Sequence, residues 1–216
     1  MAIFSMKEFT MMAITTADVF DPAHGDDEVW RNWNPTLDND HLTLGEVYES
    51  LPGFPPEAIH PLVCLFENPE SRLAFPGVAS LRRHDCLHIL LGRGLLGQDE
   101  AFVIGFTMGT SHISSPQVWA FKKIAQHLYP DIYRMSARDL VAYDLGFGYG
   151  SRHGRRDIAE FPFGQNFARS LGELRCELGF NKRNLRATYR LEQILLPDSA
   201  ASRRLPVERG MPRLAV

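Results

Sequence analysis

Apolar residues recur at helical spacing along much of the chain, whereas the alternating pattern of strands is scarce. One series runs from Val118 to Leu128 at steps of three or four residues, which places its side chains on one face of a helix. A second series runs from Phe167 to Leu178 and is followed by Gly179, a residue type that often ends helices. The predicted fold class is therefore all-α: a single compact helical domain with proline-rich loops and a flexible C-terminal tail.

Residues that start and stop helices divide the chain further. Ser115-Pro116 predicts the start of a helix and Tyr129-Pro130 its end. The next helix is predicted from Ser136 to Gly146, with a flexible turn over the glycine-rich residues 146–150. These glycines lack the Gly-Lys-Ser/Thr ending and the preceding strand of a phosphate-binding loop, so the pattern excludes a nucleotide loop here.

A proline-rich stretch precedes the centre of the chain. The six prolines of residues 51–80 exclude a long helix there, and one short helix is predicted over about 61–68. Asp40 or Thr43 is the candidate cap of an earlier helix, and Ser80 is the candidate cap of a central one.

Charge distinguishes the two ends of the chain. Residues 1–50 contain ten Asp or Glu against two Lys or Arg, and 1–40 is interpreted as an acidic N-terminal segment. The last residues are small, proline-containing and basic, which predicts a flexible basic tail over 197–216. The helical domain is expected to span residues 41–196.

Composition narrows the class of protein. With 216 residues, 44% hydrophobic and 23% charged, the chain suits one folded domain with a normal core. A net charge of −3 argues against nucleic-acid binding, which usually requires a basic surface. The three cysteines are far apart and form no Cys-x-x-Cys pair, so free thiols in a reducing compartment are expected.

The sequence shows no signal for export or membrane insertion. The N-terminus lacks the charged-then-apolar pattern of a signal peptide, and no apolar run approaches the ~20 residues of a transmembrane helix. The expected location is cytoplasmic, or peripheral on the inner face of a membrane.

Four residues with metal-ligand side chains fall within seventeen positions. His84 and His88 are at i and i+4, so a helix would place them on one face, with Asp85 at its edge. Gly92 is the first of three glycines that break this helix, and a tight turn can then bring Glu100 over the histidines. Converging imidazoles and carboxylates suit zinc, iron or manganese, and suit calcium poorly. The same string is also compatible with polar groups at the edge of a helical core.

The string His84-Asp85-x-x-His88, followed by eleven residues and Glu100, resembles the motif of the coenzyme Q (ubiquinone) biosynthesis protein 4 family. The resemblance covers roughly residues 42–180 and implies an all-helical fold with a divalent metal on these four residues, as both metal ligands and catalytic groups. Zinc is the first choice, with iron, manganese or magnesium as alternatives. The flanking segments that also resemble the family are Leu44-Gly45-Glu46-Val47-Tyr48, Leu51-Pro52-Gly53, Ile89-Leu90-Leu91-Gly92, Leu95-Leu96-Gly97, Asn166-Phe167-Ala168-Arg169 and Leu171-Gly172-Glu173-Leu174-Arg175.

The resemblance implies a role in ubiquinone biosynthesis, either as a metal-dependent lyase that decarboxylates a prenylated aromatic precursor or as an organiser of a biosynthetic complex. Its partners would then be that precursor or another isoprenoid lipid, together with other quinone-biosynthesis proteins. Apart from the resemblance, the sequence leaves the oligomeric state open and is compatible with a homodimer. One alternative is a prenyl-lipid-binding scaffold without catalysis. Another is a His-Asp metal phosphohydrolase, which would need a further upstream His and a distant Asp in the same site. His60 and Asp144 are candidates for these residues by position only.

Other residues are candidates for binding the substrate. Arg82 and Arg83 directly precede the motif, and Arg152 and Arg155 follow the glycine-rich string. A guanidinium group suits a carboxylate or phosphate. Arginines that only face solvent would look the same in the sequence. The small residues within 105–109 indicate either close helix packing, which we favour, or room for a lipid tail.

Overall fold

The computed structural model describes residues 26–52, 66, 68–156 and 158–206. Within these ranges the regular structure is helical apart from one isolated β-bridge between Thr43 and Ser170, so the all-α prediction is confirmed. The α-helices are α1 (Asp26–Asn32), α2 (Leu44–Glu49), α4 (Leu81–Leu91), α5 (Gly97–Thr110), α6 (Ser115–His127), α7 (Ala137–His153), α8 (Leu171–Glu177), α9 (Lys182–Leu195) and α10 (Ala200–Arg204), with short 3-10 helices η2 (Asp131–Tyr133), η3 (Ile158–Glu160) and η4 (Phe163–Gln165).

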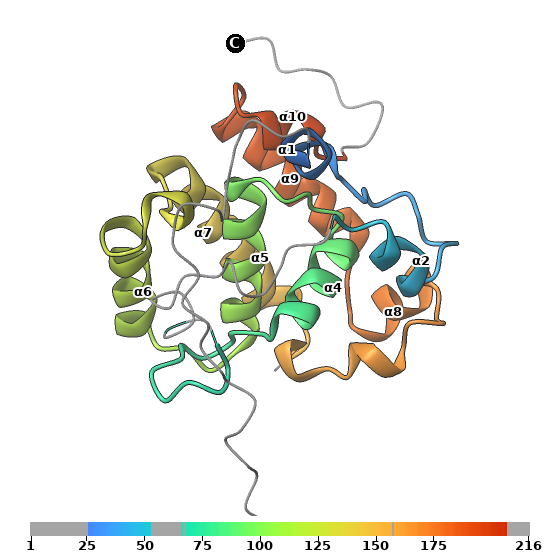
Figure 1. Ribbon diagram of the computed structural model, residues 1–216, viewed down its shortest axis with the longest axis horizontal. Helices are drawn as coiled ribbons and strands as arrows, with labels where there is room; N and C mark the ends of the chain where they lie inside the picture. Colours follow the sequence, from blue (N-terminus) through green and yellow to red (C-terminus); the bar gives the residue numbers. More distant parts are fainter. Residues whose placement is uncertain (1–25, 53–65, 67, 157, 207–216) are drawn as a thin grey trace, which may run out of the picture.

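Helices α5 and α7 form the centre of the molecule. Figure 1 shows α6 on one side of this pair, with α4, α2 and α8 on the other. Two apolar clusters flank the pair. One joins α4, α5, α8 and α9, and the other joins α5, α6 and α7. Six of the eleven residues of α4 are buried, so packing in the larger cluster fixes the position of this helix.

Glycines allow α5 and α7 to approach closely. A methyl group at Gly105 of α5 would collide with the carbonyl oxygen of Tyr143, and one at Gly146 of α7 would collide with that of Phe102. Gly109 and Gly150 repeat this arrangement one turn later. The close packing predicted for the small residues of α5 is thus confirmed.

The predicted flexible turn at residues 146–150 is wrong, because α7 continues through it to His153. Local sequence favoured a helix end, since glycine weakens a helix by about 1 kcal/mol relative to alanine. Packing against α5 overrides this preference, and two of these glycines are buried in that contact.

Caps define several helix starts. Of the two candidate caps before α2, Thr43 is the one used: its side chain accepts from the backbone N–H of Glu46, which reaches back to complete a capping box. Ser80 is the N-cap of α4, as predicted. The cap of α6 is Ser114, one residue earlier than the Ser115-Pro116 signal indicated.

The C-terminal region is more ordered than predicted. Helix α9 spans 14 residues, and α10 occupies part of the predicted tail. Ser202 and Leu205 are buried, so the chain up to residue 206 belongs to the folded body. Most of the short helix predicted over 61–68 lies outside the described residues. Residues 1–25 of the predicted acidic segment and residues 207–216 of the predicted tail also lie outside them.

Two further observations concern the environment of the protein. Cys86 and Cys176 are free thiols, as predicted. Across the described ranges, no helix combines the length and apolar character needed to cross a membrane.

Candidate metal centre

Helix α4 carries both histidines of the motif on one face. Ser80, in an extended conformation, precedes its first turn. The four-residue spacing then places His84 and His88 one turn apart, with ring centroids 4.7 Å apart. Gly92 ends the helix with a φ of 66°, a left-handed conformation that glycine adopts without strain.

A short connection brings the start of α5 next to these histidines. Residues 92–96 join the two helices, and Leu96 is the N-cap of α5. The backbone N–H of Leu96 donates to Oδ2 of Asp99 at 3.2 Å, which fixes the first turn of α5. Glu100 lies in that turn. The predicted helix-turn-helix that returns Glu100 to the two histidines is therefore confirmed.

The donor atoms of His84, His88 and Glu100 converge. Nε2 of His84 lies 3.0 Å from Nε2 of His88 and 2.8 Å from Oε2 of Glu100, and His88 Nε2 lies 3.3 Å from the same oxygen. Around a metal ion with ligand distances of about 2.0–2.1 Å, neighbouring ligand atoms are roughly 2.8 to 3.4 Å apart. The spacing of these donors fits a metal ion, and the three residues form a group that can hold one.

A backbone hydrogen bond orients the His88 ring. Nδ1 of His88 lies 2.7 Å from the carbonyl oxygen of Gly94. A carbonyl oxygen only accepts hydrogen bonds, so Nδ1 carries the proton and donates it. In the neutral ring the lone pair is then on Nε2, the atom that faces His84 and Glu100. Metal-ligating histidines are commonly held by a hydrogen bond of this kind.

The group is buried on one side and open on the other. His88 is fully buried, while the side chains of His84 and Glu100 are 18% and 35% exposed. Burial opposes ionisation of Glu100, but the neighbouring imidazoles of His88 and His84 hold the pKa of this carboxyl well below its ordinary value. The carboxylate is therefore in the ionised form that a metal ligand requires.

Asp85, the fourth predicted ligand, lies outside this three-residue group. Its Oδ2 is 3.4 Å from the hydroxyl oxygen of Tyr48 on α2. Burial raises the pKa of Asp85, and the neighbouring His84 and His88 oppose that shift. The carboxyl group of Asp85 is thus close enough to interact with the candidate centre while its oxygen is directed toward Tyr48.

Arg82 and Arg83 lie in the first turn of α4, directly before His84. The guanidinium of Arg82 lies over the ring of Phe167, 5.9 Å from its centroid. Phe167 in turn packs on Tyr48 with ring centroids 5.0 Å apart. Arg82 therefore belongs to an aromatic patch that reaches the Asp85 side of the centre.

The other two candidate arginines lie at the far end of α7. Arg152 is in its last turn, and Arg155 follows that helix and lies over the ring of Phe161 at 5.7 Å. Both are exposed. The structure associates them with the end of α7 rather than with the start of α5 where Glu100 lies.

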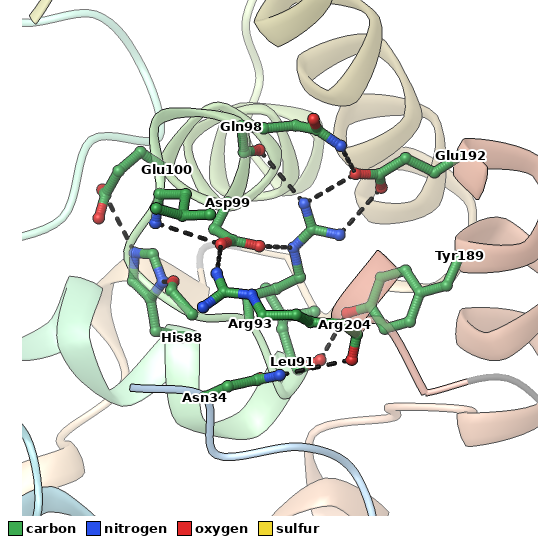
Figure 2. Close-up of polar contacts among 12 residues, drawn as sticks. Asn34, His88, Leu91, Arg93, Gln98, Asp99, Glu100, Tyr189, Glu192 and Arg204 are labelled. Carbon is green, nitrogen blue, oxygen red and sulfur yellow. Dashed lines mark hydrogen bonds and ion pairs between the residues drawn. The ribbon is translucent and has the colours of Figure 1, made fainter. Parts of the chain in front are cut away.

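A buried ionic network beside the centre was not predicted from the sequence (Figure 2). Arg93 pairs with Glu192 through two hydrogen bonds of 2.9 and 3.0 Å, and its Nε lies 3.0 Å from Oδ1 of Asp99. Arg204 reaches Oδ2 of Asp99 at 3.0 Å. The adjacent acids at 99 and 100 were the only local signal, because Arg93 and Glu192 are 99 residues apart.

Comparison with known proteins assigns no family to the chain. No family model matches it, and neither a curated protein nor a solved structure is similar to it at a significant level. The resemblance to the coenzyme Q biosynthesis protein 4 family therefore rests on the motif and flanks given above, and function has to be argued from the site.

Proposed function

We propose that this protein binds one divalent metal ion through Nε2 of His84, Nε2 of His88 and the Glu100 carboxylate, and that it acts on a prenylated aromatic precursor in ubiquinone biosynthesis. The observation that supports the metal site is the convergence of three donor atoms at separations of 2.8 to 3.3 Å. The quinone pathway is supported by the resemblance of residues 84–100 to the coenzyme Q biosynthesis protein 4 motif.

The ligand set favours zinc. Two imidazoles and one carboxylate form the protein ligands of several catalytic zinc sites, which keep a further position for water or substrate. The same set occurs in non-haem iron sites. Magnesium prefers an oxygen-rich shell and strict octahedral geometry, so the two histidines disfavour it.

The surroundings suit an aromatic acid. When bound, the metal would act as a Lewis acid and stabilise negative charge that develops on the substrate as the carboxylate leaves. The exposed edges of His84 and Glu100 give access from one side. Beside Asp85, Tyr48 and Phe167 offer aromatic rings, and Arg82 offers a guanidinium group for a carboxylate.

The phosphohydrolase alternative has less support. It requires a distant Asp in the same site, but Asp144 forms an ion pair with Lys122, and its side chain is 58% exposed. His60, the other residue that this alternative needs, lies outside the described residues. A scaffold that binds the precursor without converting it uses the same metal site, so turnover is the property that separates it from a decarboxylase.

The test has two stages. Elemental analysis of the purified protein should give about one divalent metal per chain, lost in folded His84→Ala/His88→Ala and Glu100→Gln variants. Carbon dioxide release from a prenylated aromatic acid is then measured with the metal-loaded protein and with each variant. Metal-dependent release supports the decarboxylase, and tight substrate binding without release supports the scaffold. A metal-free protein that remains so after reconstitution contradicts the proposal.

A further inference from the structure

The loop between α4 and α5 carries a buried arginine at the centre of an ionic network. Arg93 is fully buried, and the carboxylates of Asp99 and Glu192 flank its guanidinium. Arg204 closes the network on the other face of Asp99 (Figure 2). Burial alone would lower the pKa of Arg93, but the charges of Glu192 and Asp99 raise it above its ordinary value. Two cations therefore balance two anions in a site that is largely shielded from water.

Such a network is a weak source of stability. Removing charges from water costs several kcal/mol per ion, and apolar side chains of similar volume often serve stability equally well. A buried network of this kind is better explained by what its members hold in place. Here they hold the connection between α4, which carries His84 and His88, and α5, which carries Glu100.

The connection is tied down at successive positions. Arg93 donates to the carbonyl of Gln98 at 3.2 Å, which links the start of the loop to the first turn of α5. Asp99 accepts from the N–H of Leu96. Between these ties lies Gly94, whose carbonyl oxygen accepts the Nδ1 proton of His88.

Gly94 is also held from the C-terminal side. A methyl group there would lie 2.8 Å from Nη2 of Arg204, 3.1 Å from Oδ2 of Asp99 and 2.7 Å from the carbonyl oxygen of Trp33. The Arg204–Asp99 pair thus packs directly on the residue that orients His88. A shift of this pair would let the Gly94 carbonyl move.

We propose that Arg93, Asp99, Glu192 and Arg204 are positioning residues: they fix the Gly94 carbonyl and so hold His88 in the Nδ1-protonated form with Nε2 directed at the metal. The C-terminal helices α9 and α10 thereby become part of the site's support. The effect on metal binding rests on the proposed function, whereas the effect on the His88 ring does not require a metal.

Arg204 is the residue best suited to a test, because its side chain is 23% exposed and its loss leaves the Arg93–Glu192 pair intact. Arg204→Gln removes the charge, Arg204→Lys restores it, and Arg204→Met keeps the aliphatic packing if the Gln variant is poorly folded. Arg186→Gln is the matched control: the Arg186 side chain is 21% exposed, and the substitution breaks an ion pair of α9 with Asp38, which is 71% exposed and lies away from Gly94.

The first readout uses metal-free protein labelled with ¹⁵N-histidine. Long-range ¹H–¹⁵N correlation spectra report which ring nitrogen of His88 carries the proton, and a His88→Gln spectrum assigns its signals. Wild type and Arg186→Gln should show the Nδ1-protonated form. Arg204→Gln should show a mixture of the two forms with unchanged helical circular dichroism, and Arg204→Lys should recover the wild-type pattern in part.

The second readout is zinc affinity, measured by competition with a chromophoric chelator. Loss of the residues that orient a metal ligand typically weakens metal binding about tenfold to a hundredfold, so a loss in this range is expected for Arg204→Gln and none for Arg186→Gln. If wild type binds no zinc but the His88 signals change as described, the metal proposal fails and the positioning role stands. A folded Arg204→Gln variant with wild-type His88 signals overturns the positioning role, whether or not zinc binds.

Discussion

The contact between α5 and α7 makes a sharp prediction about two glycines of the same helix. A Cβ at Gly146 would lie 2.9 Å from the backbone carbonyl carbon of Phe102 and would collide with its oxygen. A Cβ at Gly148 would meet only the end of the Arg152 side chain, at 3.1 Å. The first neighbour is backbone inside a packed helix, and the second is a mobile guanidinium group.

The magnitudes follow from this difference. Alanine in place of glycine favours a helix interior by about 1 kcal/mol. Overpacking typically costs about 1–3 kcal/mol, and the upper end applies to Gly146→Ala because two helix backbones must separate. We expect Gly146→Ala to lose about 2 kcal/mol and Gly148→Ala to gain about 0.5–1 kcal/mol, a difference of roughly 3 kcal/mol between the variants.

Guanidinium-induced unfolding followed by circular dichroism measures both free energies of unfolding under one set of conditions. Because the two substitutions are chemically identical and two residues apart, they share the same change in the unfolded state. A Gly146→Ala variant as stable as Gly148→Ala would refute the close α5–α7 packing described here.

Three further predictions concern charged groups. Asp85→Asn should keep the metal stoichiometry of wild type by elemental analysis, because Asp85 lies outside the three-donor group; loss of the metal would make it a ligand after all. Glu192→Ala should lower the free energy of unfolding by about 3–5 kcal/mol, because it removes one of the two carboxylates that balance the buried Arg93. The double variant Arg93→Met/Glu192→Met should recover most of this loss in a urea titration; equal losses in both variants would contradict this reasoning. Burial opposes ionisation of Asp40, but hydrogen bonds and charges from Lys182 and Arg175 lower its pKa in the folded protein. The ionised Asp40 therefore stabilises the folded protein above the pKa that it has in the unfolded chain, and this stabilisation is lost as the pH falls through its lower pKa in the folded protein. Asp40→Asn should therefore lower the free energy of unfolding by about 1 kcal/mol at pH 7, a small value because the Asp40 side chain is 41% exposed. The difference from wild type should narrow below about pH 4; a difference that does not change with pH would exclude this cause.

The three-donor group was predictable from the sequence because its determinants are local. The i to i+4 spacing on α4 and the glycine at position 92 place His84, His88 and Glu100 within one helix-turn-helix. Asp85 shows the limit of the same reasoning. Consecutive residues on a helix point roughly 100° apart, so a residue next to His84 tends to face elsewhere, here toward Tyr48.

The supporting network was beyond prediction for a different reason. Two of its ion pairs, Arg93–Glu192 and Arg204–Asp99, join residues about 100 positions apart, and no periodic pattern in one sequence indicates which distant charges meet. Arg204 was assigned to a flexible tail because its neighbours are small and basic. Its ion pair with Asp99 depends on the packing of α9 and α10, which brings it beside a residue 105 positions away.

The direct test of a metal at His84, His88 and Glu100 is anomalous diffraction from crystals of the zinc-loaded protein, with data above and below the zinc edge. The account predicts the strongest anomalous peak between Nε2 of His84, Nε2 of His88 and the Glu100 carboxylate, about 2.0–2.2 Å from each. A peak elsewhere, or none at this group in a protein that retains its histidine–glutamate hydrogen bonds, would contradict it.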